Sequence, residues 1–208
     1  MMRDLMTAIR MAMATLILTG LAYPLLMTGL ARAIFPGRAA GSLVQRDGQV
    51  IGSELIGQRW TIPAYFHGRP SAAGPYEYDG AASCGSNLGP TSKTLRERAA
   101  GHAERLRAVN PDAPGPVPAE LVTASASGLD PHVSPGAARW QAPRVAAARG
   151  MSIIQVHALI DEMAEGAVLG FLGEPRVNVL RLNLTLDARF GACPPGHPAG
   201  TPGPDRPL

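Results

Sequence analysis

The first pattern along the chain is an uninterrupted apolar run near the amino terminus. Residues 11–31 contain no Asp, Glu, Lys, Arg or His, and Arg10 and Arg32 close the run on its two sides. At about 1.5 Å rise per residue, a helix of this length is roughly 30 Å long, which is the thickness of the hydrocarbon core of a bilayer. The pattern therefore predicts one transmembrane helix over 11–31. Pro24 lies inside it and favours a kink, because proline has no backbone donor.

A cleaved signal peptide is the alternative interpretation of this run. The sequence Ala31-Arg32-Ala33 matches the small-x-small pattern that precedes a cleavage site. The apolar stretch is, however, longer than the about 7–15 residues usual for a signal peptide. The length favours a retained anchor.

The charges around the span give only a weak orientation signal. Two arginines precede the span and three follow it before residue 50, so the positive-inside bias is small. Large domains cross membranes regardless of nearby charge. We therefore expect residues 1–10 in the cytoplasm and the body of the protein outside it.

After the span, the pattern predicts a mixed α+β domain over 32–190, on the far side of a single transmembrane helix. Asp47-Gly48 is a type I′ turn pair between apolar flanks, which predicts a hairpin over 42–53. Apolar residues at helical spacing predict a helix over 152–165, opened by a capping box of Ser152 and Gln155. Leucines alternate with polar residues over 177–187, which predicts a strand with one buried face.

The remaining segments divide into two helices, a long loop region and a tail. Helices are expected over 95–109, capped by Thr94 and Glu97, and over 136–149, after Ser134-Pro135. Residues 57–90 are rich in Gly, Pro and aromatic residues with little periodicity, so we expect ordered loops there. The tail 191–208 is rich in Pro and Gly, and we expect it to be disordered.

Composition and charge exclude some classes of function. The net charge is +3 and the arginines are spread along the chain, which does not favour a nucleic-acid-binding stripe. The five histidines show no HxxxH or HExxH spacing, so we predict no metal site. Cys84 and Cys193 could form a disulfide in an oxidising compartment, and the sequence leaves that pairing open.

Two segments suggest catalysis or phosphate binding. Residues 85–94 resemble a phosphate loop superficially, but the glycine spacing is wrong and Pro90 removes a backbone donor. Ser125 and Ser127 precede His132 closely, which raises the alternative of a membrane-anchored extracytoplasmic hydrolase. No G-x-S-x-G elbow is present, and these hydroxyl groups also suit local turns.

The predicted helix over 136–149 bears the third candidate group: Arg139, Gln141, Arg144 and Arg149. Arginine side chains bind phosphate or carboxylate groups in a forked geometry. Such a helix more often forms surface ion pairs or a protein interface, and we favour an interface.

Several blocks together resemble the KdpC family, the accessory subunits of Kdp potassium-transporting ATPases. They occur in the family's order, from the membrane helix to about Asp187. The blocks are GQRW at 57–60, YFHGRPSA at 65–72, GSNLGP at 85–90, LVTASASGLDPH at 121–132, QAPRVA at 141–146 and GEPRVNVLRLN at 173–183.

The resemblance implies a non-catalytic accessory subunit of a bacterial P-type potassium pump in the inner membrane. Members have one transmembrane helix and an extracytoplasmic domain, and they have no tightly bound cofactor. Their partners are a potassium-channel subunit, KdpA, and an ATP-hydrolysing subunit, KdpB. Members of the KdpC family are needed for assembly and are described as catalytic chaperones that raise the pump's affinity for ATP.

The resemblance also suggests functional residues. Gln141 and Arg144 would be the nucleotide-related pair. Because ATP is cytoplasmic and the domain is expected outside, we expect the ATP effect to be indirect, through the partner's conformational equilibrium. The candidate interface residues are Tyr65, Phe66, Arg69, Asn87, Asp130 and Asn178.

Overall fold

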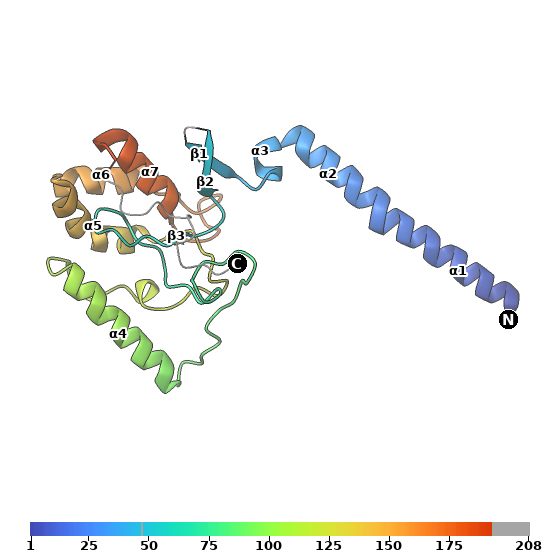
Figure 1. Ribbon diagram of the computed structural model, residues 1–208, viewed down its shortest axis with the longest axis horizontal. Helices are drawn as coiled ribbons and strands as arrows, with labels where there is room; N and C mark the ends of the chain where they lie inside the picture. Colours follow the sequence, from blue (N-terminus) through green and yellow to red (C-terminus); the bar gives the residue numbers. More distant parts are fainter. Residues whose placement is uncertain (47, 193–208) are drawn as a thin grey trace. The chain divides into compact units, whose positions relative to one another are not determined.

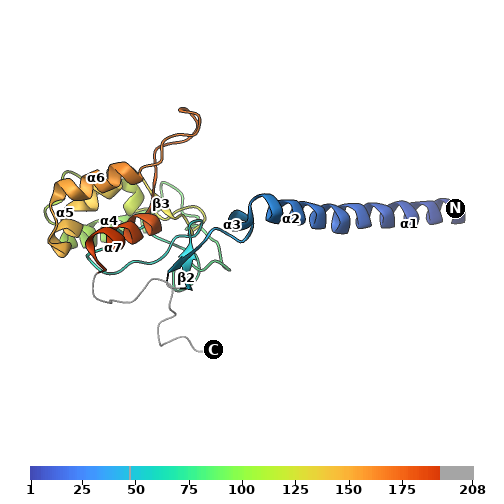
Figure 2. The same cartoon turned by 90° about the horizontal axis from the view of Figure 1, so that it is seen from above.

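The computed structural model describes residues 1–46 and 48–192, and the chain divides into two compact units, Met1–Leu43 and Val44 onward. The first unit is a helix in three parts (Figures 1 and 2): α1 (Met2–Ile17), a π-helical turn (Leu18–Ala22) and α2 (Tyr23–Ile34). The short helix α3 (Pro36–Ala39) follows.

The π-helical turn lies directly before Pro24. Within it, the N–H of Tyr23 donates to the carbonyl of Leu18, five residues back. Proline has no N–H, and in an α-helix its ring clashes with the carbonyl four residues before it, here that of Gly20. A wider turn at this point relieves that clash. The irregularity predicted at Pro24 is therefore a widened turn within a continuous helix.

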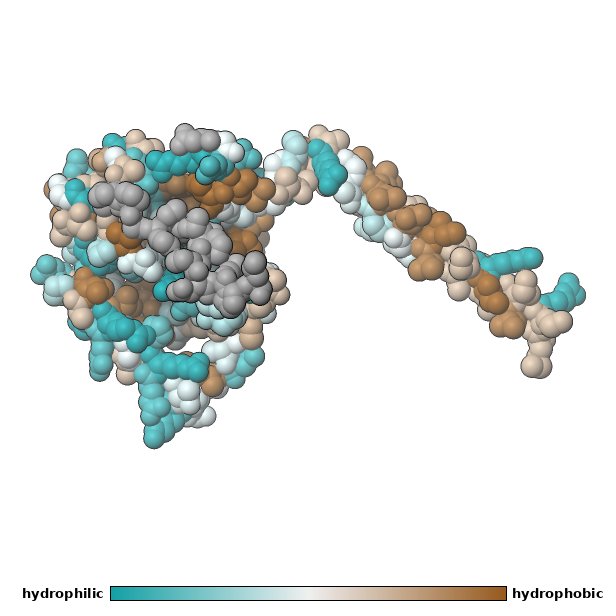
Figure 3. Space-filling view, viewed as in Figure 1, coloured by the Kyte–Doolittle hydropathy of each residue, from teal (hydrophilic) through white to brown (hydrophobic). Residues whose placement is uncertain are grey.

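Residues Met2–Ile34 form the one helix of the described chain that is long and apolar enough to cross a membrane, and none of it is buried. Apolar side chains cover much of its visible surface (Figure 3). Its 33 residues correspond to about 50 Å at 1.5 Å per residue, which exceeds a hydrocarbon core of roughly 30 Å. The uncharged part, 11–31, is therefore the part suited to the bilayer interior.

The second unit contains a mixture of short strands and helices, as predicted. Strands β1 (Leu43–Arg46) and β2 (Gln49–Ser53) form one two-stranded sheet at its start. Strands β3 (His132–Val133) and β4 (Val177–Asn178) form an antiparallel second sheet, with His132 opposite Asn178. The helices are α4 (Lys93–Val109), the 3-10 turn η2 (Ala119–Leu121), α5 (Pro135–Arg149), α6 (Ile153–Met163) and α7 (Val179–Phe190).

The hydrophobic core lies among the last three helices, and α6 packs against both α5 and α7 (Figures 1 and 2). Phe66 from the loop region joins this core and is fully buried. Helix α5 continues through Pro143. The other buried side chains include Trp140, Val145, Val156, Ile160, Leu182 and Leu186.

Most of the local predictions are confirmed. The hairpin, three helices and the loop region without helix or strand over 57–90 are all present. The capping box of Ser152 and Gln155 forms as predicted. The cap of α4 is different, because Ser92 accepts the hydrogen bond from the Leu95 N–H and Thr94 lies inside the helix. Cys193, and with it the open question of a disulfide, lies outside the described residues.

The predicted strand over 177–187 is wrong. Only Val177 and Asn178 are extended, and Asn178 then caps α7 by accepting from the Arg181 N–H at 3.1 Å. The buried positions of α7 follow helical spacing and include Asn183 and Asp187. Because these polar residues lie on the buried face, the apolar residues alone do not show a helical period. The alternation of leucines with polar residues is then the more evident pattern in the sequence.

Candidate functional site

Residues 62–67 form a segment that side chains from α5 and α7 hold by its backbone, and we call it the clamped segment. Asn183 accepts from the Phe66 N–H at 2.8 Å and donates to the Phe66 carbonyl at 2.9 Å. Gln141 does the same for His67, at 2.9 and 3.1 Å. Each amide thus supplies the donor and the acceptor that a neighbouring strand would otherwise supply.

Two arginines of α5 complete the clamp. Arg144 donates to the Pro63 carbonyl and, at 3.0 Å, to the Gln141 side chain. Arg149 donates to the Ala64 carbonyl at 2.7 Å. Arginine suits this role because its planar guanidinium presents several donors in a fixed geometry.

Tyr65 links the clamp to α7. Its hydroxyl donates to Asp187 at 3.1 Å, and its ring lies 4.7 Å from the Arg149 guanidinium carbon. Arg149 also pairs with Asp187 at 2.8 Å, where both side chains are almost fully buried. Arg46 also lies 3.3 Å from Asp187. Loss of Asp187 would therefore leave the buried Arg149 charge uncompensated, whereas loss of Arg149 would leave Asp187 with one cationic partner.

The clamp changes the acid–base behaviour of its members. Burial, and secondarily the charge of Arg144, lowers the pKa of His67 to about 4. The ring Nε2 lies 3.2 Å from the Ile62 carbonyl, which fits a neutral imidazole that donates there. Burial also lowers the pKa of Arg144 to about 10, so this residue stays charged at neutral pH.

The residues suggested for a nucleotide role therefore lie inside the clamp. Gln141 is 1% exposed and Arg144 is 7% exposed, and their polar atoms are bonded to residues 63–67. Tyr65 and Phe66, expected at an interface, are buried in the same cluster. The nucleotide and interface roles themselves stay predictions.

Three other expected interface residues lie in a second region of the same unit. Arg69 pairs with Asp130 at 3.3 Å, and Asp130 accepts from the His132 N–H at 3.0 Å. Partial burial raises the pKa of Asp130, but the hydrogen bonds from His132 and the charge of Arg69 outweigh it and hold that pKa below its usual value. Asn178, opposite His132 in the small sheet, donates to the Glu54 carbonyl at 2.8 Å.

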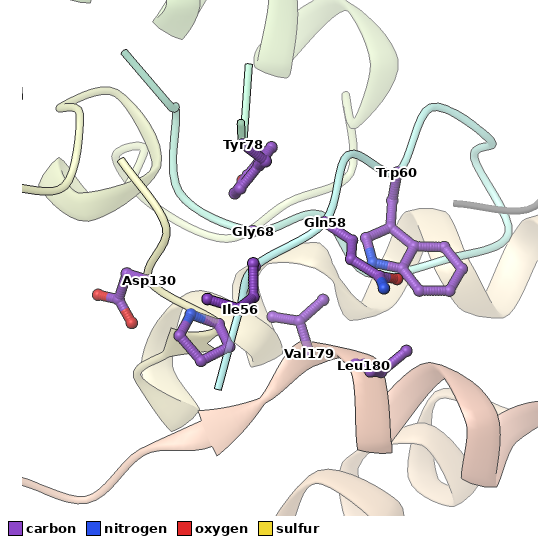
Figure 4. Close-up of a pocket in the computed structure, with 10 residues that line it drawn as sticks. Ile56, Gln58, Trp60, Gly68, Tyr78, Asp130, Val179 and Leu180 are labelled. Carbon is purple, nitrogen blue, oxygen red and sulfur yellow. The ribbon is translucent and has the colours of Figure 1, made fainter. Parts of the chain in front are cut away.

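A small cavity borders this region and is lined by Gln58, Tyr78 and Asp130, among others (Figure 4). Its free volume is about 10 Å³, which is room for about one water molecule. Gly57 lines it, and a Cβ there would lie 2.6 Å from the Asp130 carbonyl oxygen. Close packing, and not ligand binding, explains glycine in the 57–60 block.

Asn87 lies apart from both groups. It is exposed and adopts a left-handed backbone conformation, with φ of 51°. Asparagine tolerates this conformation better than most residues. The position therefore remains accessible on the loop region.

The structure gives no support to the hydrolase alternative. Ser127 Oγ accepts from the Leu129 N–H at 3.1 Å, and Ser125 is buried. Within residues 1–46 and 48–192, neither hydroxyl group is hydrogen-bonded to His132. The His132 ring instead lies 3.6 Å from Asp130.

Sequence reasoning missed Asn183 and Asp187 as parts of the clamp, and it placed Arg149 at an interface rather than in this buried cluster. One signal was available: Asn183 and Asp187 are four residues apart and share one helical face with Leu182 and Leu186. A helical interpretation of 179–190 would have placed both polar residues toward the core.

One helix long and apolar enough to cross a membrane, followed by an α+β body, is the architecture of a single-span membrane protein. The family described as "KdpC: K+-transporting ATPase, c chain" matches residues 5–188. The chain belongs to this family, which confirms the resemblance noted in its motifs.

Relatives named "Potassium-transporting ATPase KdpC subunit" are similar over nearly the whole chain. The protein of Myxococcus xanthus is 61% identical over 199 residues, covering 95% of this chain and 94% of the relative. That of Nitratidesulfovibrio vulgaris is 56% identical over 197 residues, covering 93% of this chain and 100% of the relative. That of Sorangium cellulosum is 56% identical over 170 residues, covering 82% and 90%.

Proposed function

We propose that this chain is a non-catalytic subunit of a potassium-importing ATPase in the bacterial inner membrane. The helix Met2–Ile34 anchors it, and the second unit lies on the extracytoplasmic side. There it binds a KdpA-like channel subunit and a KdpB-like ATP-hydrolysing subunit, and the complex needs it for assembly. The observation that supports this most is the family match, which extends from the span to α7.

The proposal includes an indirect effect on ATP. The subunit raises the apparent ATP affinity of the hydrolysing subunit by binding one of its conformational states better than another. A tenfold rise in affinity requires a preference of about 1.4 kcal/mol. Gln141 and Arg144 act by holding the clamped segment, since their polar groups already bond to residues 63–67. No tightly bound cofactor is needed for this role.

The test compares the purified pump with and without this chain. We expect the complex that lacks it to assemble poorly, and any residual potassium-stimulated ATPase activity to show a raised KM for ATP. Full assembly and an unchanged KM without the chain would contradict the proposal.

A matched pair of variants separates the indirect from the direct ATP effect. Gln141→Ala and Asn183→Ala each remove one amide that holds the clamped segment. An indirect effect predicts that both variants raise the KM for ATP to a similar extent. A change confined to Gln141→Ala would indicate direct contact with the nucleotide.

A further inference from the structure

The connection between α6 and β4 is a hairpin that extends away from the rest of the second unit (Figure 2), and we call residues 165–176 the projecting hairpin. Glu165 and Arg176 exchange backbone hydrogen bonds of 2.8 and 2.9 Å. Val168 and Leu172 do the same nearer the tip, also at 2.8 and 2.9 Å. The hairpin therefore has a defined shape before it meets any partner.

The tip of the projecting hairpin is apolar and exposed. Leu169 is 79% and Phe171 is 74% exposed, and Val168 and Leu172 are each more than half exposed. No charged residue lies between Glu165 and Glu174. A contiguous group of large apolar side chains on a surface is a feature of interaction sites.

The backbone at the tip adds a second observation. Leu169 has φ of 56°, a left-handed conformation that is unfavourable for a residue of this size. Glycine or asparagine would adopt it with less strain. Strained residues of this kind occur at functional sites, where the conformation presents a side chain.

Ion pairs fix the base of the hairpin to α7. Glu165 lies 3.2 Å from Arg176 and 3.5 Å from Arg181, and Arg181 also lies 3.6 Å from Glu54. These ion pairs restrict the motion of the hairpin, so less conformational entropy is lost when the tip binds a partner.

The composition of the hairpin favours a protein partner over the lipid bilayer. Segments that insert at the membrane interface typically carry Trp or Tyr together with Lys or Arg, and 165–176 contains none of these except Arg176, which is paired. Glu174 makes no ion pair with any described residue. An unpaired carboxylate two residues after Leu172 also disfavours insertion into the bilayer, because a charge is costly to bury in an apolar medium.

We propose that the projecting hairpin inserts Phe171 and its apolar neighbours into a hydrophobic pocket of another pump subunit, with a basic group at the pocket rim facing Glu174. This inference rests on the proposed function, because it needs other subunits. A pre-shaped tip with one aromatic residue at its centre suits a protein pocket, where shape complementarity and a desolvated aromatic anchor give most of the affinity.

Photocrosslinking in the assembled complex identifies the occupant. A benzophenone amino acid is placed at Phe171 and, as a matched control, at Ile154, which is 75% exposed on α6. We expect the probe at Phe171 to crosslink to another pump subunit and the probe at Ile154 to give little crosslinking. Crosslinking of the Phe171 probe to lipid alone, or to no macromolecule, would overturn the proposal.

Substitution measures the contribution to assembly. Phe171→Ser and Ile154→Ser remove side chains of matched exposure, so neither should change the folding of the second unit. We expect Phe171→Ser to reduce copurification with a tagged partner subunit at least tenfold under stringent washing, and Ile154→Ser to leave it unchanged. Equal retention of both variants would contradict a role for the hairpin.

The two proposals fail in different ways. If the wild-type chain copurifies with the pump but the Phe171 probe and variant show no effect, the hairpin proposal fails and the proposed function stands. If the wild-type chain itself does not copurify with a potassium-transporting complex, the proposed function fails.

Discussion

At the scale of single residues, two buried side-chain amides make the backbone hydrogen bonds that a neighbouring strand would make in a sheet. Asn183 and Gln141 each satisfy an N–H and a carbonyl of the clamped segment. A buried backbone group left without a partner costs about 1–3 kcal/mol. The clamp therefore holds the backbone of residues 62–67 in place, although this segment belongs to no sheet.

His67 makes the stability of this region dependent on pH. Its pKa in the folded protein is about 4, below the ordinary value of 6.5, so the unfolded state takes up a proton first as the pH falls. We expect the free energy of unfolding to decrease between pH 6.5 and 4 by on the order of 3 kcal/mol from this residue, and to level off below pH 4.

The matched variant is His67→Gln, which keeps a donor for the Ile62 carbonyl but does not titrate. Urea unfolding of the detergent-solubilised chain can be followed by tryptophan fluorescence, because Trp60 and Trp140 both lie in the second unit. The variant should lose much of the pH dependence above pH 4. An identical pH dependence in both proteins would show that other groups are responsible.

At the scale of elements, local prediction worked where cap residues or an apolar face of helical spacing marked the helix. Helix α6 is an example, since Val156, Leu159 and Ile160 are its buried residues and share one face. Helix α7 was mistaken for a strand because Asn183 and Asp187 share its buried face. What these polar residues bond to lies more than 30 residues away in the chain, so no local pattern could reveal it.

The cap residues of α6 and α7 differ in burial and in the number of hydrogen bonds that they make, which gives a test at this scale. Ser152→Ala removes an exposed cap and should destabilise the second unit by about 1 kcal/mol. Asn178→Ala removes a buried cap and also a hydrogen bond to the Glu54 carbonyl. We expect Asn178→Ala to lower the free energy of unfolding by about 2–3 kcal/mol. Urea unfolding monitored by tryptophan fluorescence gives both values, and equal losses would contradict the double role of Asn178.

At the scale of the whole molecule, the single span makes orientation the decisive property. Cys84 is exposed on the loop region, so it reports the side on which the second unit lies. In a Cys193→Ser variant, we expect a membrane-impermeant maleimide to label Cys84 on intact spheroplasts, because the second unit is proposed to be extracytoplasmic. The measurement is the mass or gel shift of the labelled chain.

A second variant provides the internal control for this experiment. Thr7→Cys, with both native cysteines replaced, places the thiol before the uncharged run and should react only after permeabilisation. Labelling of Cys84 only after permeabilisation would place the second unit in the cytoplasm and would contradict the proposed orientation.

The sequence by itself determined the span, the hairpin, most of the helices and the family. These follow from local hydrophobic periodicity, turn and cap residues, and the ordered series of motifs. Only the tertiary structure decided that 179–190 is a helix, that Gln141 and Arg144 face the clamped segment, and that the tip of 165–176 projects. Each of these depends on contacts or exposure set by residues distant in the chain, which neighbouring residues do not encode.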